Sequence, residues 1–129
     1  MNDKIFLLSK EEYEKYKDKI PLIKTHWWLR TTENPIYVYM VDYNGFVDKK
    51  GMGMILGVRP VIRISASDNI INVSENIILH AGVTWNKIDN DLYIAENPIA
   101  FKRFNNTTND IPPAVISFLA EWYNERKGW

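Results

Sequence analysis

The fold of this chain is built around residues 36–48, which read IYVYMVDYNGFVD. Side chains alternate between the two faces of a strand, so Tyr37, Tyr39 and Val41 face one side of residues 36–41, and Ile36, Val38 and Met40 face the other. Asn44-Gly45 favours the positive φ angles of a tight turn, and residues 46–48 return as the partner strand. The stretch therefore predicts a β-hairpin with an aromatic face.

Further strands are expected on both sides of this hairpin, because short runs rich in β-branched and aromatic residues alternate with turn residues. They are residues 4–8, 27–31, 58–64, 77–81, 83–88 and 92–95. Pro60 has no N–H to give to a sheet, so we expect it at an edge, at a bulge or at the start of its strand. Residues 49–53 are expected to form a basic, flexible loop, and residues 65–75 a surface connection.

Two helices are expected. Ser9 is a typical N-cap, and Glu12 stands three residues later, which is the spacing of a capping box. This first helix ends by Ile20, because a proline follows. The second begins at Pro112, and apolar residues then recur at i, i+3, i+4 and i+7 from Val115 to Trp122, which predicts an amphipathic helix that packs on a sheet.

The composition is that of one globular domain. The chain has 129 residues, 46% of them hydrophobic, which is enough for one core. Sixteen Lys and Arg balance sixteen Asp and Glu, so no net charge draws the protein to nucleic acid or to an anionic membrane. Because no repeat or linker interrupts the pattern, we expect one α+β domain over residues 1–129.

Metal, cofactor and membrane functions find no support in the sequence. There is no cysteine, which excludes disulfides and thiolate ligands and agrees with a reducing compartment. The apolar run from Ile5 to Leu8 is too short for a signal peptide or a membrane span, so a cytoplasmic location is expected. His26 and His80 lack metal-ligand spacing, and no catalytic motif is present. We therefore expect no metal and no cofactor, and binding rather than catalysis.

Four landmarks follow one another in residues 4–65. They are FLLS with Glu11-Glu12 (residues 6–12), WWLRT (27–31), a Tyr-to-Val segment around Gly45 (39–47), and GVRP (57–60). This order resembles an uncharacterised bacterial domain family with the pattern FLLS, WWLRS and GVRP, which is similar to C-type-lectin-like and formylglycine-generating-enzyme-like folds. The resemblance implies a compact, C-type-lectin-like mixed sheet with two helices, a scaffold often used for variable binding surfaces. It implies no chemistry.

The second half of the chain resembles the first half of the same family. There, a pattern of Trp, Ile, Leu, Ile and Ala leads through an aromatic segment to a helix; here it runs from Trp85 to Ala95, within residues 76–129. Because this half normally precedes FLLS, we expect a circular permutation joined through residues 65–76. Joined termini must lie side by side, so residues 92–95 and 58–64 should share a sheet.

Arg30 and Arg59 match the arginines of two landmarks and allow two interpretations. An arginine between apolar neighbours presents five donors that must be satisfied, so a structural role that links strands is one of them. The other is an anion clamp for a phosphate or a carboxylate. Replacing Arg59 by Ala should abolish folding under the first interpretation, but spare folding and lose the ligand under the second.

The tyrosine face and the loops beside it, residues 31–33 and 48–54, form the predicted binding surface. If exposed, the tyrosines could stack on a base or anchor a protein partner. The alternative is a second buried face, covered by the helix from Pro112 or by Trp27 and Trp28. Methionines beside glycine make adaptable contacts or fill gaps in a core. The candidate binding residues are Thr32, Glu33, Tyr37, Tyr39, Tyr43, Lys49, Lys50, Met52 and Met54.

Three functions fit these features. The first is a non-enzymatic binding protein, in particular a phage or mobile-element inhibitor that binds a host defence protein. This hypothesis rests on the small size of the chain and on the absence of catalytic motifs in its sequence. The second is an oligomer that sequesters an anionic nucleotide between aromatic rings and arginines, since an outward aromatic face favours self-association. The third is an enzyme of unknown type acting on such a ligand. A co-purified protein supports the first, and a retained small molecule the second.

Overall fold

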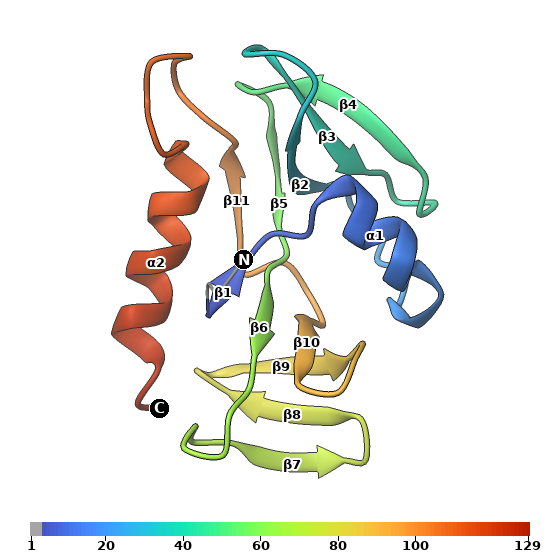
Figure 1. Cartoon of the computed structure of the whole chain (residues 1–129), viewed down its shortest axis with the longest axis vertical. Coiled ribbons are helices and arrows are strands. Elements are labelled where there is room, and N and C mark those ends of the chain that lie inside the picture. Colours follow the sequence, from blue (N-terminus) through green and yellow to red (C-terminus); the bar gives the residue numbers. More distant parts are fainter. Residues whose placement is uncertain (1–3) are drawn as a thin grey trace.

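The computed structural model describes residues 4–129 as an α+β fold of two α-helices and eleven strands (Figure 1). The helices are α1 (Lys10–Tyr16), continued by a 3-10 turn (Lys17–Lys19), and α2 (Ala114–Arg126). The strands are β1 (Ile5–Phe6), β2 (Trp27–Thr32), β3 (Tyr37–Val41), β4 (Val47–Gly51), β5 (Ile55–Val58), β6 (Val61–Arg63), β7 (Ile71–Ser74), β8 (Ile77–His80), β9 (Val83–Lys87), β10 (Leu92–Ala95) and β11 (Ala100–Arg103). The expected α+β class with two helices is confirmed.

The strands belong to two sheets that lie end to end (Figure 1). The six-stranded sheet, in the order β1-β6-β10-β9-β8-β7, is antiparallel throughout. The five-stranded sheet, in the order β11-β5-β2-β3-β4, contains one parallel contact, between Trp27 and Gly57. One mixed sheet was expected; residues 58–64 are instead divided between β5 and β6, because Arg59-Pro60 interrupts the ladder there.

The two helices cover opposite sides of the sheets. Apolar residues of α1 and the turn after it, including Tyr13 and Ile20, pack with Trp27, Val41 and Ile94 from both sheets. The helix α2 covers the other side through two further clusters of buried residues. One joins Val115 and Leu119 to the five-stranded sheet, and the other joins Trp122 and Tyr123 to the six-stranded sheet. The α2 pattern is therefore that of a helix buried along one face, as predicted.

The start of α1 is the predicted capping box. The Ser9 hydroxyl accepts a hydrogen bond from the Glu12 N–H at 3.0 Å, and the Glu12 carboxylate accepts one from the Ser9 N–H at 2.8 Å. The start of α2 differs from the prediction. Pro113 is its N-cap and Ala114 its first residue, so both prolines precede the helix instead of forming its first turn.

The predicted hairpin is formed by β3 and β4, but its turn differs from the expected one. Within this turn, only Gly45 has a positive φ, of 88°. The Gly45 N–H donates to the Asp42 carbonyl at 2.9 Å. The Asp42 side chain also accepts hydrogen bonds from the N–H groups of Asn44 and Phe46. The turn is therefore held by Asp42, and a left-handed conformation is required at Gly45 alone.

Two segments that were expected to be irregular contain strands: residues 49–51 extend β4, and residues 71–74 form β7. A third strand, β11 at residues 100–103, was not predicted. All three lie at sheet edges, where only one side of a strand is paired and polar or charged side chains are accommodated in solvent. Lys49 and Lys50 are therefore strand residues and not part of a flexible loop.

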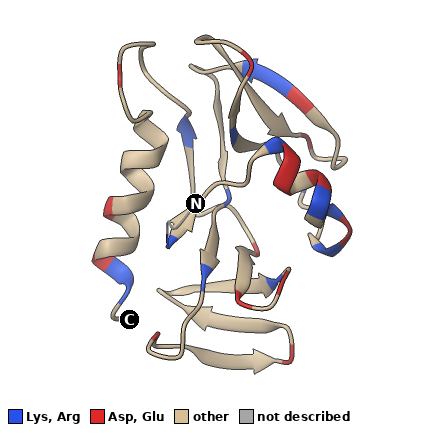
Figure 2. Ribbon diagram, viewed as in Figure 1, with Lys and Arg blue, Asp and Glu red and all other residues tan. Residues whose placement is uncertain are grey.

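β6 and β10 are neighbours in the six-stranded sheet, with Tyr93 opposite Ile62. This is the adjacency that a circular permutation requires, and the permutation itself stays a hypothesis. Lys and Arg side chains are interspersed with Asp and Glu over the whole fold, most densely along α1 (Figure 2). Within residues 4–129, neither helix is long and apolar enough to cross a lipid bilayer.

Candidate functional site

The hairpin brings two of the predicted loops together at one end of the molecule. The Tyr37 carbonyl accepts a hydrogen bond from the Glu33 N–H at 2.9 Å, and the Ile36 carbonyl accepts one from the Met52 N–H at 2.8 Å. The Lys49 ammonium lies 2.6 Å from the Glu33 carboxylate. We call this region the hairpin-end surface; it comprises Glu33, Ile36, Tyr37, Lys49, Met52 and Met54.

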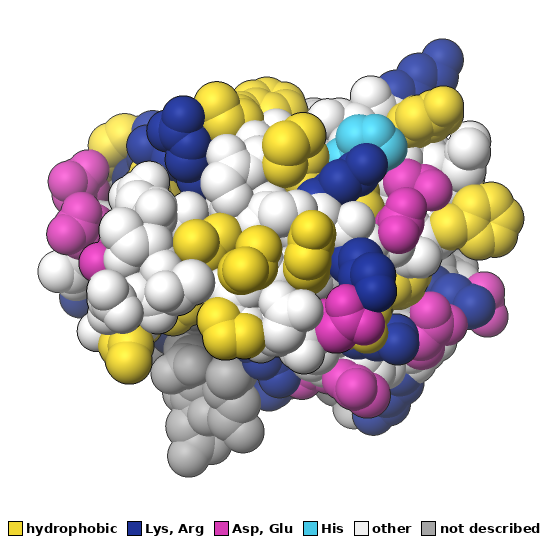
Figure 3. Space-filling view, turned by 90° about the horizontal axis from the view of Figure 1, so that it is seen from above, with side chains coloured by type: hydrophobic (Ala, Val, Ile, Leu, Met, Phe, Trp, Pro, Cys, Tyr) yellow, Lys and Arg dark blue, Asp and Glu magenta, His cyan; other side chains and the backbone are white. Residues whose placement is uncertain are grey.

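The hairpin-end surface exposes apolar side chains. Ile36 is 54% exposed, Tyr37 45% and Met54 51%, whereas Met52 is half-buried against the core beside α2. Figure 3 looks onto this end and shows hydrophobic side chains near its centre, with basic and acidic side chains on either side. Such a mixture of an apolar centre and a charged rim is typical of protein-binding surfaces.

Tyr39 and Lys50 do not belong to this exposed surface. Tyr39 is half-buried against the core beneath α1, and the Lys10 ammonium lies 4.5 Å from the centre of its ring. Lys50 pairs with Val38, whose side chain is buried on the opposite face of the sheet. Of the two alternatives, an exposed or a covered tyrosine face, the covered one therefore holds for Tyr39, and the cover is α1 instead of the helix from Pro112 or Trp27 and Trp28.

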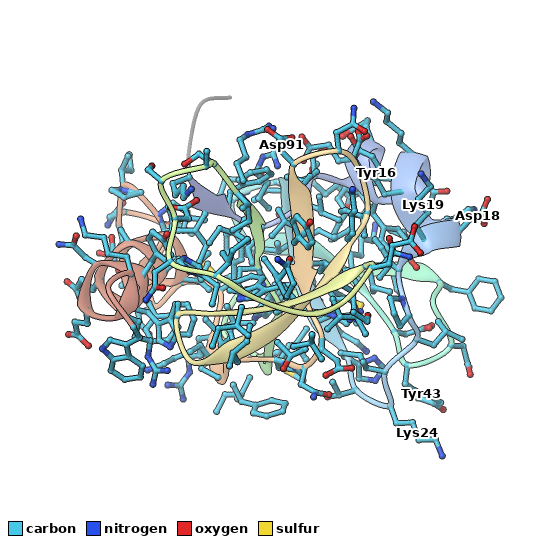
Figure 4. All side chains as sticks on the ribbon, turned by 90° about the horizontal axis from the view of Figure 1, so that it is seen from below. Tyr16, Asp18, Lys19, Lys24, Tyr43 and Asp91 are labelled. Carbon is cyan, nitrogen blue, oxygen red and sulfur yellow. The ribbon has the colours of Figure 1, made fainter. Side chains whose placement is uncertain are left out.

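Tyr43 lies at the other end of the hairpin, in its turn. Its ring packs against His26, with ring centres 5.3 Å apart. A strand rises about 3.3 Å per residue, so six residues separate Tyr43 from Tyr37 by roughly 20 Å. In Figure 4, Tyr43 projects from the same side of the molecule as Lys24, away from Tyr16, Asp18 and Lys19 on α1 and the turn after it. Tyr43 is therefore separate from the hairpin-end surface.

Arg59 is 1% exposed and its donors are used within the protein. It donates to the carbonyls of Ala95 at 2.8 Å, Pro21 at 3.0 Å and Glu96 at 3.4 Å. Its guanidinium also lies 5.2 Å from the centre of the Trp27 ring. Burial lowers the pKa of Arg59 to about 10, so the side chain remains charged at neutral pH. These contacts favour a structural role over an anion clamp.

Arg30 has both structural contacts and access to solvent. Its Nη1 donates to the Leu7 carbonyl at 2.7 Å and forms an ion pair with Glu12. Burial raises the pKa of the Glu12 carboxyl, but hydrogen bonds from Arg30 and Ser9 outweigh this effect and hold the pKa below its ordinary value. Arg30 therefore ties β2 to the start of α1, and its side chain is still 23% exposed.

A groove of about 1090 Å³ lies along α2. One wall is the helix itself, through Ile116, Leu119, Ala120, Tyr123 and Lys127. The facing wall comes from β1, Arg30 and Thr32 of β2, and the turn at residues 67–69. A volume of this size suits a small organic ligand. We call this hollow the α2 groove.

A hydrogen-bonded chain closes one end of the α2 groove. His80 Nδ1 donates to the Asn69 carbonyl at 2.6 Å, which leaves Nε2 to accept from the Tyr123 hydroxyl at 2.9 Å. Burial, with a smaller contribution from Asp68, raises the pKa of Tyr123 to about 12. Asp68 itself is paired with Lys4. The chain joins α2 to the 67–69 turn and holds the groove walls in place.

Residues 4–129 contain no cluster of three His, Cys, Asp or Glu side chains that could ligate a metal. Nothing matches this chain among family models, curated proteins or solved structures. Membership of the bacterial family thus stays a hypothesis that rests on the four landmarks.

The sequence indicated the hairpin-end surface but not the α2 groove. The groove is lined by Lys4, Asp68 and Lys127 among others, which come from three distant parts of the chain. One signal was present in α2: Ile116, Ala120 and Asn124 recur at i, i+4 and i+8 beside the buried face, with a small residue at the centre. A small residue in the middle of such a helical row leaves room for a groove between the helix and the element that packs beside it.

Proposed function

We propose that this protein is a non-enzymatic binding protein that contacts a protein partner through the hairpin-end surface. The observation that carries the proposal is the exposure of Ile36, Tyr37 and Met54 at the same end of the hairpin, near the Lys49–Glu33 ion pair. Tyrosine and methionine are enriched at the centres of protein interfaces, and a tyrosine loses little conformational entropy when it is buried there.

The rigid backbone beneath this surface also supports the proposal. Five consecutive residue pairs join β3 to β4, from Tyr37 opposite Gly51 to Val41 opposite Val47. The Asn34 side chain accepts hydrogen bonds from the N–H groups of Ile36 and Tyr37, both at 2.9 Å, and so fixes the loop before the strand. A preformed surface binds more tightly than a mobile one, because less ordering entropy is lost on association.

The test is affinity purification of the tagged protein from its natural host. A Tyr37→Glu/Met54→Glu double variant should lose the partner that the unchanged protein retains, with at least a tenfold loss of affinity, about 1.4 kcal/mol. An Ile71→Glu/Val73→Glu variant of β7 is the matched control, since these side chains are 61% and 60% exposed. Equal retention by both variants would contradict the proposal.

The narrower form of the proposal is that the partner is a host defence protein and that binding inhibits it, as expected of a small phage or mobile-element protein. Its support is the small size of the domain and the lack of catalytic motifs in its sequence. Co-expression with candidate defence systems tests it. Restored phage growth with the unchanged protein, lost in the Tyr37→Glu/Met54→Glu variant, is the expected result.

A further inference from the structure

The α2 groove is long and mostly apolar. Its helical wall extends from Ile116 to Lys127, eleven residues on, which corresponds to about 16 Å along the helix axis. Ile116 and Ala120 of the helix and Ile5 of β1 line it with apolar side chains that are not fully buried. The shape fits an extended apolar body better than a compact polar one.

The charged side chains of the groove are mainly basic. Lys4, Arg30 and Lys127 line it, against the single carboxylate of Asp68, which Lys4 already neutralises. Within residues 4–129, Arg30 uses only Nη1 for hydrogen bonds to protein acceptors. Its Nε and Nη2 make no hydrogen bond to residues 4–129 and are not fully buried, and the side chain as a whole is 23% exposed. Thr32, two residues further along β2, also lines the groove.

The aromatic rings of the groove are already engaged. The guanidiniums of Arg30 and Arg63 lie 5.7 and 5.2 Å from the centre of the Phe6 ring. Phe104 packs edge-on against Trp28, with ring centres 5.6 Å apart, and Tyr123 packs against His80. All three rings are also less than 10% exposed, so they offer little surface for stacking a nucleobase, which argues against the anionic nucleotide considered above. Aliphatic contacts remain, from Ile5, Ile116 and Ala120.

We propose that the α2 groove binds an amphiphilic anion, an alkyl chain with one carboxylate or phosphate head group. The head group accepts hydrogen bonds from Nε and Nη2 of Arg30 and from Thr32, as planar guanidiniums bind such groups. The chain lies along α2 over the half-buried Ile116 and the exposed Ala120, where it removes apolar surface from water. This site is separate from the hairpin-end surface and does not depend on the function proposed there.

Calorimetric titration with decanoate, below its micelle-forming concentration, tests the proposal. Decanoate and decyl phosphate should both bind, and decyltrimethylammonium, with the same chain and the opposite charge, should bind at least tenfold more weakly. Binding of only one of the two anions would identify the head group and support the site. Equal binding of the cation, or no binding of either anion, would overturn the proposal.

Two variants locate the binding. Ala120→Phe places a large ring in the groove and should weaken the binding of decanoate at least tenfold. Ser117→Phe, at an exposed position of the same helix outside the groove, should leave the affinity for decanoate unchanged. Arg30→Lys keeps the charge beside Glu12 but removes the planar donor group, and should weaken the binding of decanoate several-fold. Should Arg30→Lys fail to fold, the comparison of Ala120→Phe with Ser117→Phe still shows whether decanoate binds in the groove. Unchanged affinity in Ala120→Phe means that decanoate binds elsewhere and the proposal is wrong.

Discussion

Arg59 is the residue on which the joint between the two sheets depends. It follows β5 of one sheet and precedes β6 of the other, and its guanidinium donates to carbonyls that follow α1 and end β10. A buried arginine is costly to desolvate, and here that cost is offset because each of its three nitrogens has a carbonyl acceptor. Trp27 lies beside it and completes the contact.

We predict that Arg59→Met lowers the free energy of unfolding by about 3 kcal/mol or more, since three carbonyls lose a charged donor. Urea unfolding followed by circular dichroism measures the change. Arg63→Met is the control: Arg63 packs on the Phe6 ring, and its replacement should cost under about 1 kcal/mol. Equal losses in the two variants would show that the hydrogen bonds of Arg59 contribute nothing specific.

Glu12 makes stability depend on pH. Its folded-state pKa lies below its ordinary value of 4.5, because hydrogen bonds from Arg30 and Ser9 outweigh the effect of burial. A lowered pKa means that the contribution is fully present above 4.5 and is lost as the pH falls through the folded-state value. Lys4 and Ser65 act on Asp68 in the same direction, against the opposing effect of burial.

We therefore predict that urea unfolding midpoints fall as the pH is lowered from 7 into the acid range, and that Glu12→Gln reduces this fall. The variant should be less stable than the unchanged protein at neutral pH, and the two should converge in acid. Glu14→Gln, which removes an exposed carboxylate of the same helix, should leave the pH dependence unaltered. A Glu12→Gln curve parallel to that of the unchanged protein would contradict the assignment.

Among the elements, the β3–β4 hairpin depends most on one backbone conformation. Gly45 has a φ of 88°, and a Cβ atom there would lie 2.7 Å from Leu22 Cδ2. The Tyr13 hydroxyl donates to the Gly45 carbonyl at 2.6 Å, so the turn is also tied to α1. Tyr13 therefore ties the turn to α1, whereas Leu22 is 68% exposed and its side chain can move away from an added Cβ atom.

We predict that Gly45→Ala destabilises the fold by about 1–3 kcal/mol, because a residue with a Cβ atom is strained in the left-handed conformation that the turn requires. Gly53→Ala is the matched control, since nothing lies within 4 Å of a Cβ atom at that position and its φ is not positive. Thermal unfolding of both variants measures the difference. Similar melting temperatures for the two would contradict the account of the turn.

How far the elements could be predicted depends on where their determinants lie. The capping box of α1 and the strands β8, β9 and β10 followed from residues within a few positions of each other. Residues 49–51 of β4 and the edge strands β7 and β11 did not, because polar or charged side chains break the apolar alternation that indicates a strand.

The candidate sites follow the same rule. Tyr37 and Met54 could be expected near each other, because a hairpin places them at one end. The covering of Tyr39 by Lys10 could not be expected, since it depends on where α1 packs. Likewise the α2 groove exists only after α2, β1 and the 67–69 turn have come together.

At the scale of the whole molecule, the two candidate sites are built from different elements. The hairpin-end surface belongs to β3, β4 and the loops joined to them, whereas the α2 groove is formed by α2, β1, β2 and the turn before β7. A partner bound at one site leaves most of the residues of the other uncovered. We therefore expect protein binding and small-anion binding to be separable by substitution.

The measurement that tests the central claim most directly is site-specific photo-crosslinking in the natural host. A photoreactive amino acid at Ile36 of the hairpin-end surface is compared with one at Val73 of β7, since both side chains are well exposed. We predict a defined crosslinked product of one protein partner from position 36 and none from position 73. The same product from both positions, or from position 73 alone, would contradict the claim that the hairpin end is the binding surface.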